Sequence, residues 1–192
     1  MQLVGFKRAT VGIFDKTGKM TRQFVIQGDQ DKGATVSAEI TGLSKEPSKV
    51  FGSDIAYYVS QKGTGDVGVD FGFLDIVEED NDEILGYKTN ENGLAFIGED
   101  TEPPYCSVLL ESSDLSGETA LLGFFKGKFS KDGETLNTQT NDAFEPEAQS
   151  YKYAAIANDA EGEAKGQTVV KYVGSDKVAI DALKGLVFPA GE

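Results

Sequence analysis

Carboxylates are the residues of this chain that could do chemistry, because they are abundant and form two dense groups. The densest is the acidic run 78–83, and a second pair, Asp29 and Asp31, flanks Gln30. Calcium loops place oxygen ligands at alternate positions and use a glycine for a sharp turn. The run 78–83 has no glycine and stands where a helix is predicted to begin. We therefore interpret it as the acidic first turn of that helix and predict no metal site.

The sequence lacks the residue types and patterns that other kinds of catalytic site need. The sequence has no histidine, which removes the commonest general base and metal ligand. Cys106, the single cysteine, lies in the apolar run YCSVLL, which predicts an inert buried thiol. Scattered carboxylates do not make the unequal pair that acid–base catalysis needs, and the glycines form no phosphate-binding motif. We predict that the chain is not an enzyme and binds no cofactor.

Charge, cysteine content and apolar run length narrow the classes of protein to which the chain could belong. The 192 residues include 18 basic and 32 acidic ones, a net charge of −14. Such acidity argues against gripping nucleic acid, although nucleic acid could still slide past the protein. A lone cysteine allows no intrachain disulfide and fits a reducing cytosol. No signal-peptide pattern and no apolar run of about 20 residues is found, so we predict no membrane association.

Two segments alternate with the period of a β-strand, residues 35–41 and 65–76. The apolar positions predict a core face: Val36, Ala38, Ile40, Val67, Val69, Phe71 and Phe73. The positions between them predict a face of small and acidic residues: Thr35, Ser37, Glu39, Thr41, Asp66, Gly68, Asp70 and Gly72. A smooth, negatively charged face suits a surface that must not bind what passes it. An antiparallel strand with one solvated side is the plainer alternative.

The rest of the chain predicts a mainly β fold. Further strands are expected at 4–14, 23–27, 55–61, 94–97, 105–112, 119–130, 134–139, 150–157 and 168–173. Helices are expected at 78–85 and at 176–186, the second capped by Ser175, with a helical turn over 44–52. These elements predict a β-sandwich or barrel with one or two helices packed on it. No linker divides the chain, so we expect a single domain over residues 1–192.

With these residues laid out, the chain resembles the major tail proteins of long-tailed siphophages that infect Gram-positive bacteria. The resemblance is best over residues 4–140. Its motifs, in order, are VGFKRATVGIF, ATVSAEITGL, EPSKVF, GDVGVDFGFLDI, NGLAFIGEDTEPPYCSVLLES and ALLGFFKGKFSKDGETLNTQT. The last 50 residues resemble the family less closely, and no appended immunoglobulin-like domain is expected.

The resemblance implies a tail-tube-type β-sandwich or barrel, related to the tubes of contractile tails and type VI secretion systems. It implies a structural virion protein that forms hexameric rings, which stack into the tube through which DNA is ejected. The implied partners are other copies of the chain, a tape-measure protein in the lumen, and tail terminator and distal tail proteins at the ends. Double-stranded DNA would pass without specific binding. The resemblance also implies that the protein is assembled in the host cytoplasm and resides in the virion tail.

Ring geometry assigns roles to the predicted surfaces. Six subunits with about four lumen strands each give a barrel about 45–50 Å across at the backbone, wide enough for duplex DNA. We expect the small and acidic face to line this lumen, where carboxylates repel phosphate. Ring stacking is expected to use the N-terminal strand, the C-terminal region and one exposed loop, formed by Gly28, Asp29, Gln30, Asp31, Lys32 and Gly33.

Two other classes remain open. A tube protein of a phage-tail-like bacteriocin or secretion system would share the fold and carry no DNA. An unrelated β-sandwich binding module would be a stable monomer that recognises a glycan or peptide.

Overall fold

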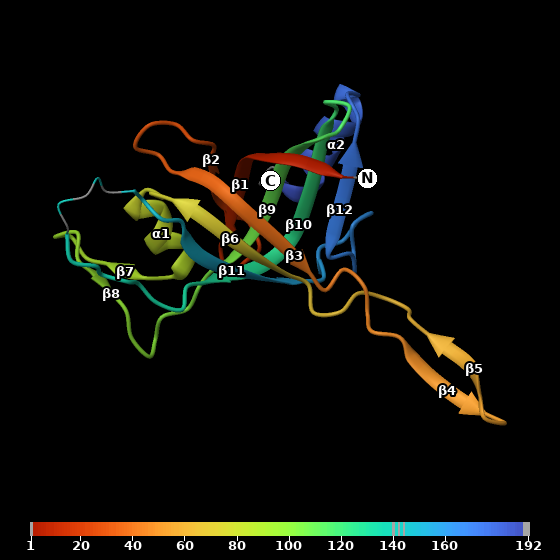
Figure 1. Cartoon of the computed structure of the whole chain (residues 1–192). Coiled ribbons are helices and arrows are strands. Elements are labelled where there is room, and N and C mark those ends of the chain that lie inside the picture. The colour runs from red at the N-terminus through yellow and green to blue at the C-terminus, as the bar shows by residue number, and fades with distance from the viewer. Residues whose placement is uncertain (1, 140, 142, 144, 190–192) are drawn as a thin grey trace.

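The main feature of the fold is a large antiparallel sheet with strand order β2-β1-β9-β10-β11-β6-β3, in which β12 also pairs with β10 (Figure 1). The computed structural model describes residues 2–139, 141, 143 and 145–189. The strands of this sheet are β1 (Leu3–Phe14), β2 (Met20–Ile26), β3 (Ala34–Thr41), β6 (Gly68–Leu74), β9 (Tyr105–Asp114), β10 (Thr119–Ser130), β11 (Gln149–Ile156) and β12 (Val169–Val173). The prediction of a mainly β fold is confirmed.

The sheet curls so that its two faces differ. Its inner face holds the main core, in which Phe71 stacks on Phe73 with ring centroids 4.9 Å apart. Phe129 and Tyr153 extend the same cluster at 4.9 Å. The curl brings β3 back toward β1, where the Thr35 hydroxyl donates a hydrogen bond to the carbonyl of Phe6 at 2.8 Å. The result is a partly closed barrel filled with aromatic side chains.

Two helices complete the body. Helix α1 (Glu78–Leu85) places Ile84 and Leu85 in the main core and ends at Gly86, whose φ of 72° is left-handed. Helix α2 (Lys177–Val187) packs on the outer side of β9 and β10 and forms a second cluster there. The cap of α2 is Asp176, which accepts from the Val178 amide at 2.9 Å, and not the predicted Ser175. Neither helix is long and apolar enough to cross a membrane.

Two small hairpins extend from the body at different places (Figure 1). One joins β4 (Ser48–Gly52) to β5 (Ile55–Ser60), and the other joins β7 (Lys88–Thr89) to β8 (Ala95–Phe96). The first overturns the predicted helical turn over 44–52, because β-prone residues there pair with the next strand. The predicted strand at 134–139 is also absent, since β11 occupies the edge of β10 that such a hairpin would need.

Candidate functional site

The outward side chains of four adjacent strands form one continuous surface, which we call the polar face. Residues directly opposite each other in antiparallel strands project to the same side, so the strand register identifies its members. They are Lys128 and Ser130 of β10, Ser150, Lys152 and Ala154 of β11, Gly68, Asp70 and Gly72 of β6, and Ser37, Glu39 and Thr41 of β3. Six of the eight residues that the sequence assigned to one small and acidic face lie together here.

The polar face carries both signs of charge. Asp70 stands directly opposite Glu39 on one side and directly opposite Lys152 on the other. The Lys152 ammonium also contacts Asp132 at 2.5 Å, and this hydrogen bond, with the two carboxylate charges, raises the Lys152 pKa. The predicted face of small and acidic residues is therefore part of a wider surface that also carries lysines. Sequence reasoning missed the lysines because it did not predict that β11 pairs with β6.

A bulge in β3 corrects two assignments. The pairing jumps from Thr35 opposite Phe73 to Ser37 opposite Gly72, which leaves Val36 without a partner residue. Thr35 therefore turns to the core side, where its hydroxyl meets the β1 backbone, and is not on the polar face. Val36, predicted in the core, is 50% exposed. One extra residue inverts the alternation of inward and outward side chains at this point, and no sequence pattern predicts it.

The other predicted core positions pack as expected on the inner side. Val67, Val69, Phe71 and Phe73 are at most 4% exposed. The partly buried Ala38 and Ile40 pack against the same cluster.

The two ends of the predicted β6 surface behave differently. Asp66 is exposed but lies before the strand, which begins at Gly68 rather than at the predicted Gly65. Gly72 is buried under its neighbours, since a Cβ there would lie 2.6 Å from the Ser37 hydroxyl and 3.4 Å from Ala148. A glycine at this position lets the chain before β11 lie against β6.

The predicted stacking loop, residues 28–33, is a closed and largely exposed turn between β2 and β3. The Gly28 amide donates to the Gly33 carbonyl at 2.9 Å, and the Gln27 side chain donates to Asp29 at 2.9 Å. Asp31 takes a left-handed φ of 59°. The loop is polar and exposed apart from Gly33, which is buried.

Three carboxylates of the acidic run in α1 are paired with one arginine of the same chain. Arg22 of β2 reaches Asp80 at 2.5 Å, Glu83 at 2.6 Å and Glu79 at 3.1 Å. Burial raises the pKa of Asp80, and the Arg22 charge partly offsets that rise. Among the described residues, no group of acidic or cysteine side chains is arranged to hold a metal ion. The cluster is an ion-pair network that fastens α1 to the sheet.

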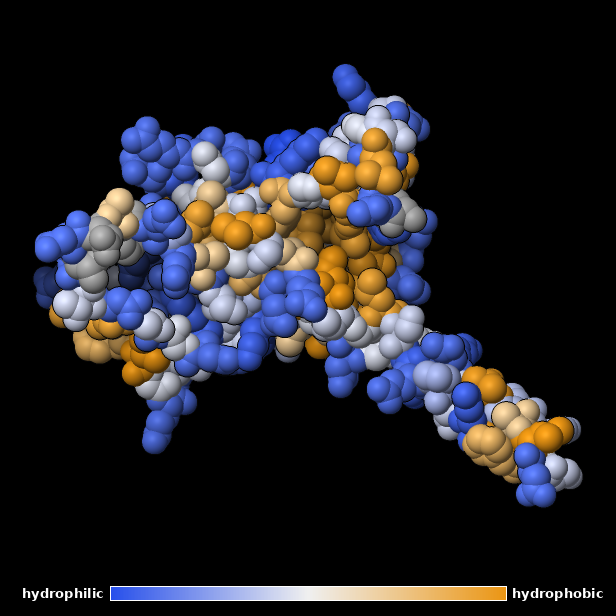
Figure 2. Space-filling view, in the orientation of Figure 1, coloured by the Kyte–Doolittle hydropathy of each residue, from blue (hydrophilic) through white to orange (hydrophobic). Residues whose placement is uncertain are grey.

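The β4–β5 hairpin is the most exposed apolar element of the molecule, and Figure 2 shows its apolar side chains standing away from the body. In its register, Val50 and Tyr58 share one face of the ribbon, while Phe51 and Val59 lie on the other. These four side chains are 51–69% exposed, and Tyr57 is 81% exposed. A ribbon with apolar side chains on both faces is unfavourable in water unless another surface covers it.

Sequence reasoning missed this hairpin because its turn is unusual. Ser53 and Asp54 form a two-residue turn in which both residues have positive φ, 50° and 63°. This geometry normally selects Asn-Gly or Asp-Gly. The signal that was available lay in adjacent apolar residues, Val50-Phe51 and Tyr57-Tyr58-Val59, which fill both faces of a strand at once.

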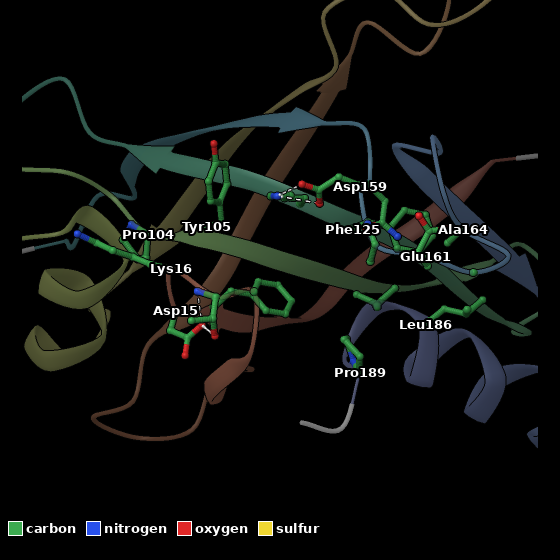
Figure 3. A pocket seen from close by; sticks show the side chains of 18 of the residues that line it. Asp15, Lys16, Pro104, Tyr105, Phe125, Asp159, Glu161, Ala164, Leu186 and Pro189 are labelled. Carbon is green, nitrogen blue, oxygen red and sulfur yellow. Dashed lines mark hydrogen bonds and ion pairs between the residues drawn. The ribbon is translucent and has the colours of Figure 1, made fainter. Parts of the chain in front are cut away.

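A groove of about 1000 Å³ opens on the outer side of the sheet (Figure 3). One wall is the β1–β2 turn (14–18) with residues 102–105, and the other is loop 158–164 with the end of α2. The ammonium groups of Lys126 and Lys128 lie 4.6 Å and 4.7 Å from the centre of the Tyr105 ring. Lys126 is also paired with Asp159 at 2.7 Å. The groove thus has apolar surfaces and a charged rim.

Cys106 cannot serve as a nucleophile in this structure. Its side chain is completely buried, and burial raises the pKa of the thiol to about 12. A neutral, inaccessible thiol matches the prediction of an inert core cysteine.

A mainly β barrel with a polar sheet face and an exposed apolar hairpin is typical of a structural protein. Residues 1–180 match the model of the phage tail tube protein family, and the chain belongs to that family. The resemblance inferred from the motifs is confirmed at this level, and the chain is a structural component of a phage tail, not an enzyme. Comparison with curated proteins identifies no similar sequence.

Proposed function

We propose that this protein is the subunit of a siphophage tail tube, in which hexameric rings stack into the conduit for DNA ejection. The observation that carries self-assembly is the β4–β5 hairpin, whose two apolar faces find no cover among the described residues. An isolated two-stranded hairpin is marginal in water, so this element gains order when another copy covers it. The family match supports the tube as the assembly that does so.

The polar face is proposed as the lumen surface. Strands β10, β11, β6 and β3 present it, which supports the count of about four strands per subunit behind a 24-stranded ring. Two of its strands carry Lys128 and Lys152 and the next two carry Asp70 and Glu39, so phosphate would meet no extended basic patch on which to stick. DNA would slide past hydroxyls, glycines and locally paired charges. The tape-measure protein would occupy the same lumen before ejection.

The proposal also covers the contacts at the ends of each ring and of the tube, and the place where the tube is assembled. Loop 28–33 and the chain ends remain candidates for ring stacking, and tail terminator and distal tail proteins would contact the terminal rings. The subunit would act as one domain, assemble in the host cytoplasm and reside in the virion tail. The polar face would not need a cofactor or metal for this role.

Electron microscopy of the purified protein in negative stain, with light scattering across a concentration series, tests the function. Hollow tubes or rings with six-fold end views are expected as concentration rises. End views of another symmetry would contradict the hexamer. A protein that stays monomeric at every concentration would contradict unaided self-assembly and favour the binding-module alternative.

A further inference from the structure

We propose that the groove between the β1–β2 turn and the end of α2 receives the β4–β5 hairpin of a neighbouring copy. This inference rests on the proposed self-assembly and names the two surfaces that would meet. It concerns a contact between copies, and the polar face contributes only Lys128 to the groove.

The hairpin cannot fill the groove of its own chain. Every residue of β4 and β5 is exposed, so the ribbon makes no extensive contact with its own body. Figure 1 shows the hairpin pointing away from the sheet. To fill such a groove, the hairpin must therefore enter the groove of a second molecule. The contact then joins two different surfaces, the hairpin of one copy and the groove of the other. Such heterologous contacts generate closed rings or continuing stacks, which are the two operations that a tube needs.

The shapes of the two elements match. The ribbon exposes apolar side chains on both faces, as Val50 with Tyr58 and Phe51 with Val59. A flat surface could cover only one of these faces, whereas a groove with two walls covers both. Figure 3 shows Tyr105 and Pro104 on one side of the groove and Leu186 and Pro189 on the other. Burial of apolar area on both faces would then stabilise the ribbon.

The charges of the two elements also match. The segment 44–62 holds three lysines and two acids, which makes it slightly basic within a strongly acidic chain. The groove lining holds five acids (Asp15, Glu102, Asp159, Glu161 and Glu163) and three lysines (Lys16, Lys126 and Lys128). Two of these lysines are already engaged, Lys126 with Asp159 and Lys128 with Glu102. The rim is thus net acidic and suits a slightly basic insert.

Cysteine cross-linking in assembled tubes tests the contact. The double variants Ala56→Cys with Glu161→Cys, and Ala56→Cys with Lys16→Cys, place one thiol near the hairpin tip and one on a groove wall. The matched control is Ala56→Cys with Asn92→Cys, because Asn92 is an exposed turn residue of the other hairpin. Cys106 stays in place, since it is buried and unreactive. Each variant is assembled without wild-type protein, its tubes are checked by electron microscopy, and it is then treated with a short bismaleimide.

A ladder of covalent oligomers is expected from a groove pair, none from the single variants and none from the Asn92 control. Tubes that form but give no ladder with either groove pair would overturn the groove contact and leave the proposed function standing. A ladder with the Asn92 pair alone would also overturn it, by placing the β7–β8 hairpin opposite β4–β5. Wild-type protein that forms neither rings nor tubes would contradict the proposed function, and the groove contact with it.

Discussion

Lys152 lies directly opposite Asp70 in the β6–β11 ladder, so a basic residue borders the two strands of the polar face that carry acids, β6 and β3. Glu39 and Asp70 are like charges placed side by side, an arrangement that is unfavourable in a cross-strand pair. Lys152 compensates both this pair and Asp132. The polar face is therefore balanced locally although the whole chain is strongly acidic.

Replacing Lys152 with Glu should lower the melting temperature, because three nearby carboxylates then repel a fourth. Added salt should shrink the difference from wild type, since exposed charges are screened. Thermal unfolding at low and high ionic strength measures this. Lys152→Gln is the control and should show a smaller effect. A deficit for Lys152→Glu that salt does not change would show that the side chain acts through packing instead.

Two phenylalanines should separate folding from assembly. Phe71→Ala empties the centre of the aromatic core and should cost about 3–5 kcal/mol of unfolding free energy. Phe51→Ala, on the hairpin and 69% exposed, should change that free energy by less than about 0.5 kcal/mol. The same Phe51 variant should reduce tube formation. Denaturant unfolding and light scattering measure the two effects, and a Phe51 variant that assembles like wild type would contradict the role of the hairpin.

Gly86 should resist substitution because two constraints coincide there. Its φ is left-handed, and a Cβ would lie 2.2 Å from the carbonyl oxygen of Glu102. Gly86→Ala should therefore cost more than about 2 kcal/mol of unfolding free energy. Gly93 has a similar φ but no atom near the position of a Cβ, so Gly93→Ala should cost only about 1–2 kcal/mol. Equal losses in the two variants would show that the backbone angle alone matters.

Arg22→Gln should cost about 1–2 kcal/mol of unfolding free energy near pH 7, because three carboxylates lose a half-exposed cation. The loss should shrink on acidification. The folded-state pKa of Asp80 is already raised, and removing Arg22 raises it further. The folded variant then binds a proton more readily than the unfolded chain, so its stability rises relative to wild type as pH falls toward about 4.

Denaturant unfolding of both proteins at several pH values measures this change. A difference that stays constant between neutral and acidic pH would show that Arg22 acts through its hydrocarbon stem rather than its charge.

Local pattern was enough to predict much of this protein. Alternation in 65–76 predicted that Val69, Phe71 and Phe73 face the core, because a strand must turn successive side chains to opposite faces. The missing histidine and the apolar surroundings of Cys106 argued against catalysis, and the order of motifs pointed to the family. These inferences succeeded because residue type and near-neighbour geometry decide them.

Tertiary structure decided the rest, because the deciding contacts join residues far apart in the chain. The bulge at Val36 turned Thr35 inward, and the pairing of β6 with β11 placed Lys152 beside Asp70. The two-residue turn at Ser53 and Asp54 made a hairpin where a helical turn was predicted. Strand register, partner choice and the cover of an apolar face depend on the free energy of the whole assembly of strands. That free energy cannot be predicted from the pattern of a single segment of sequence.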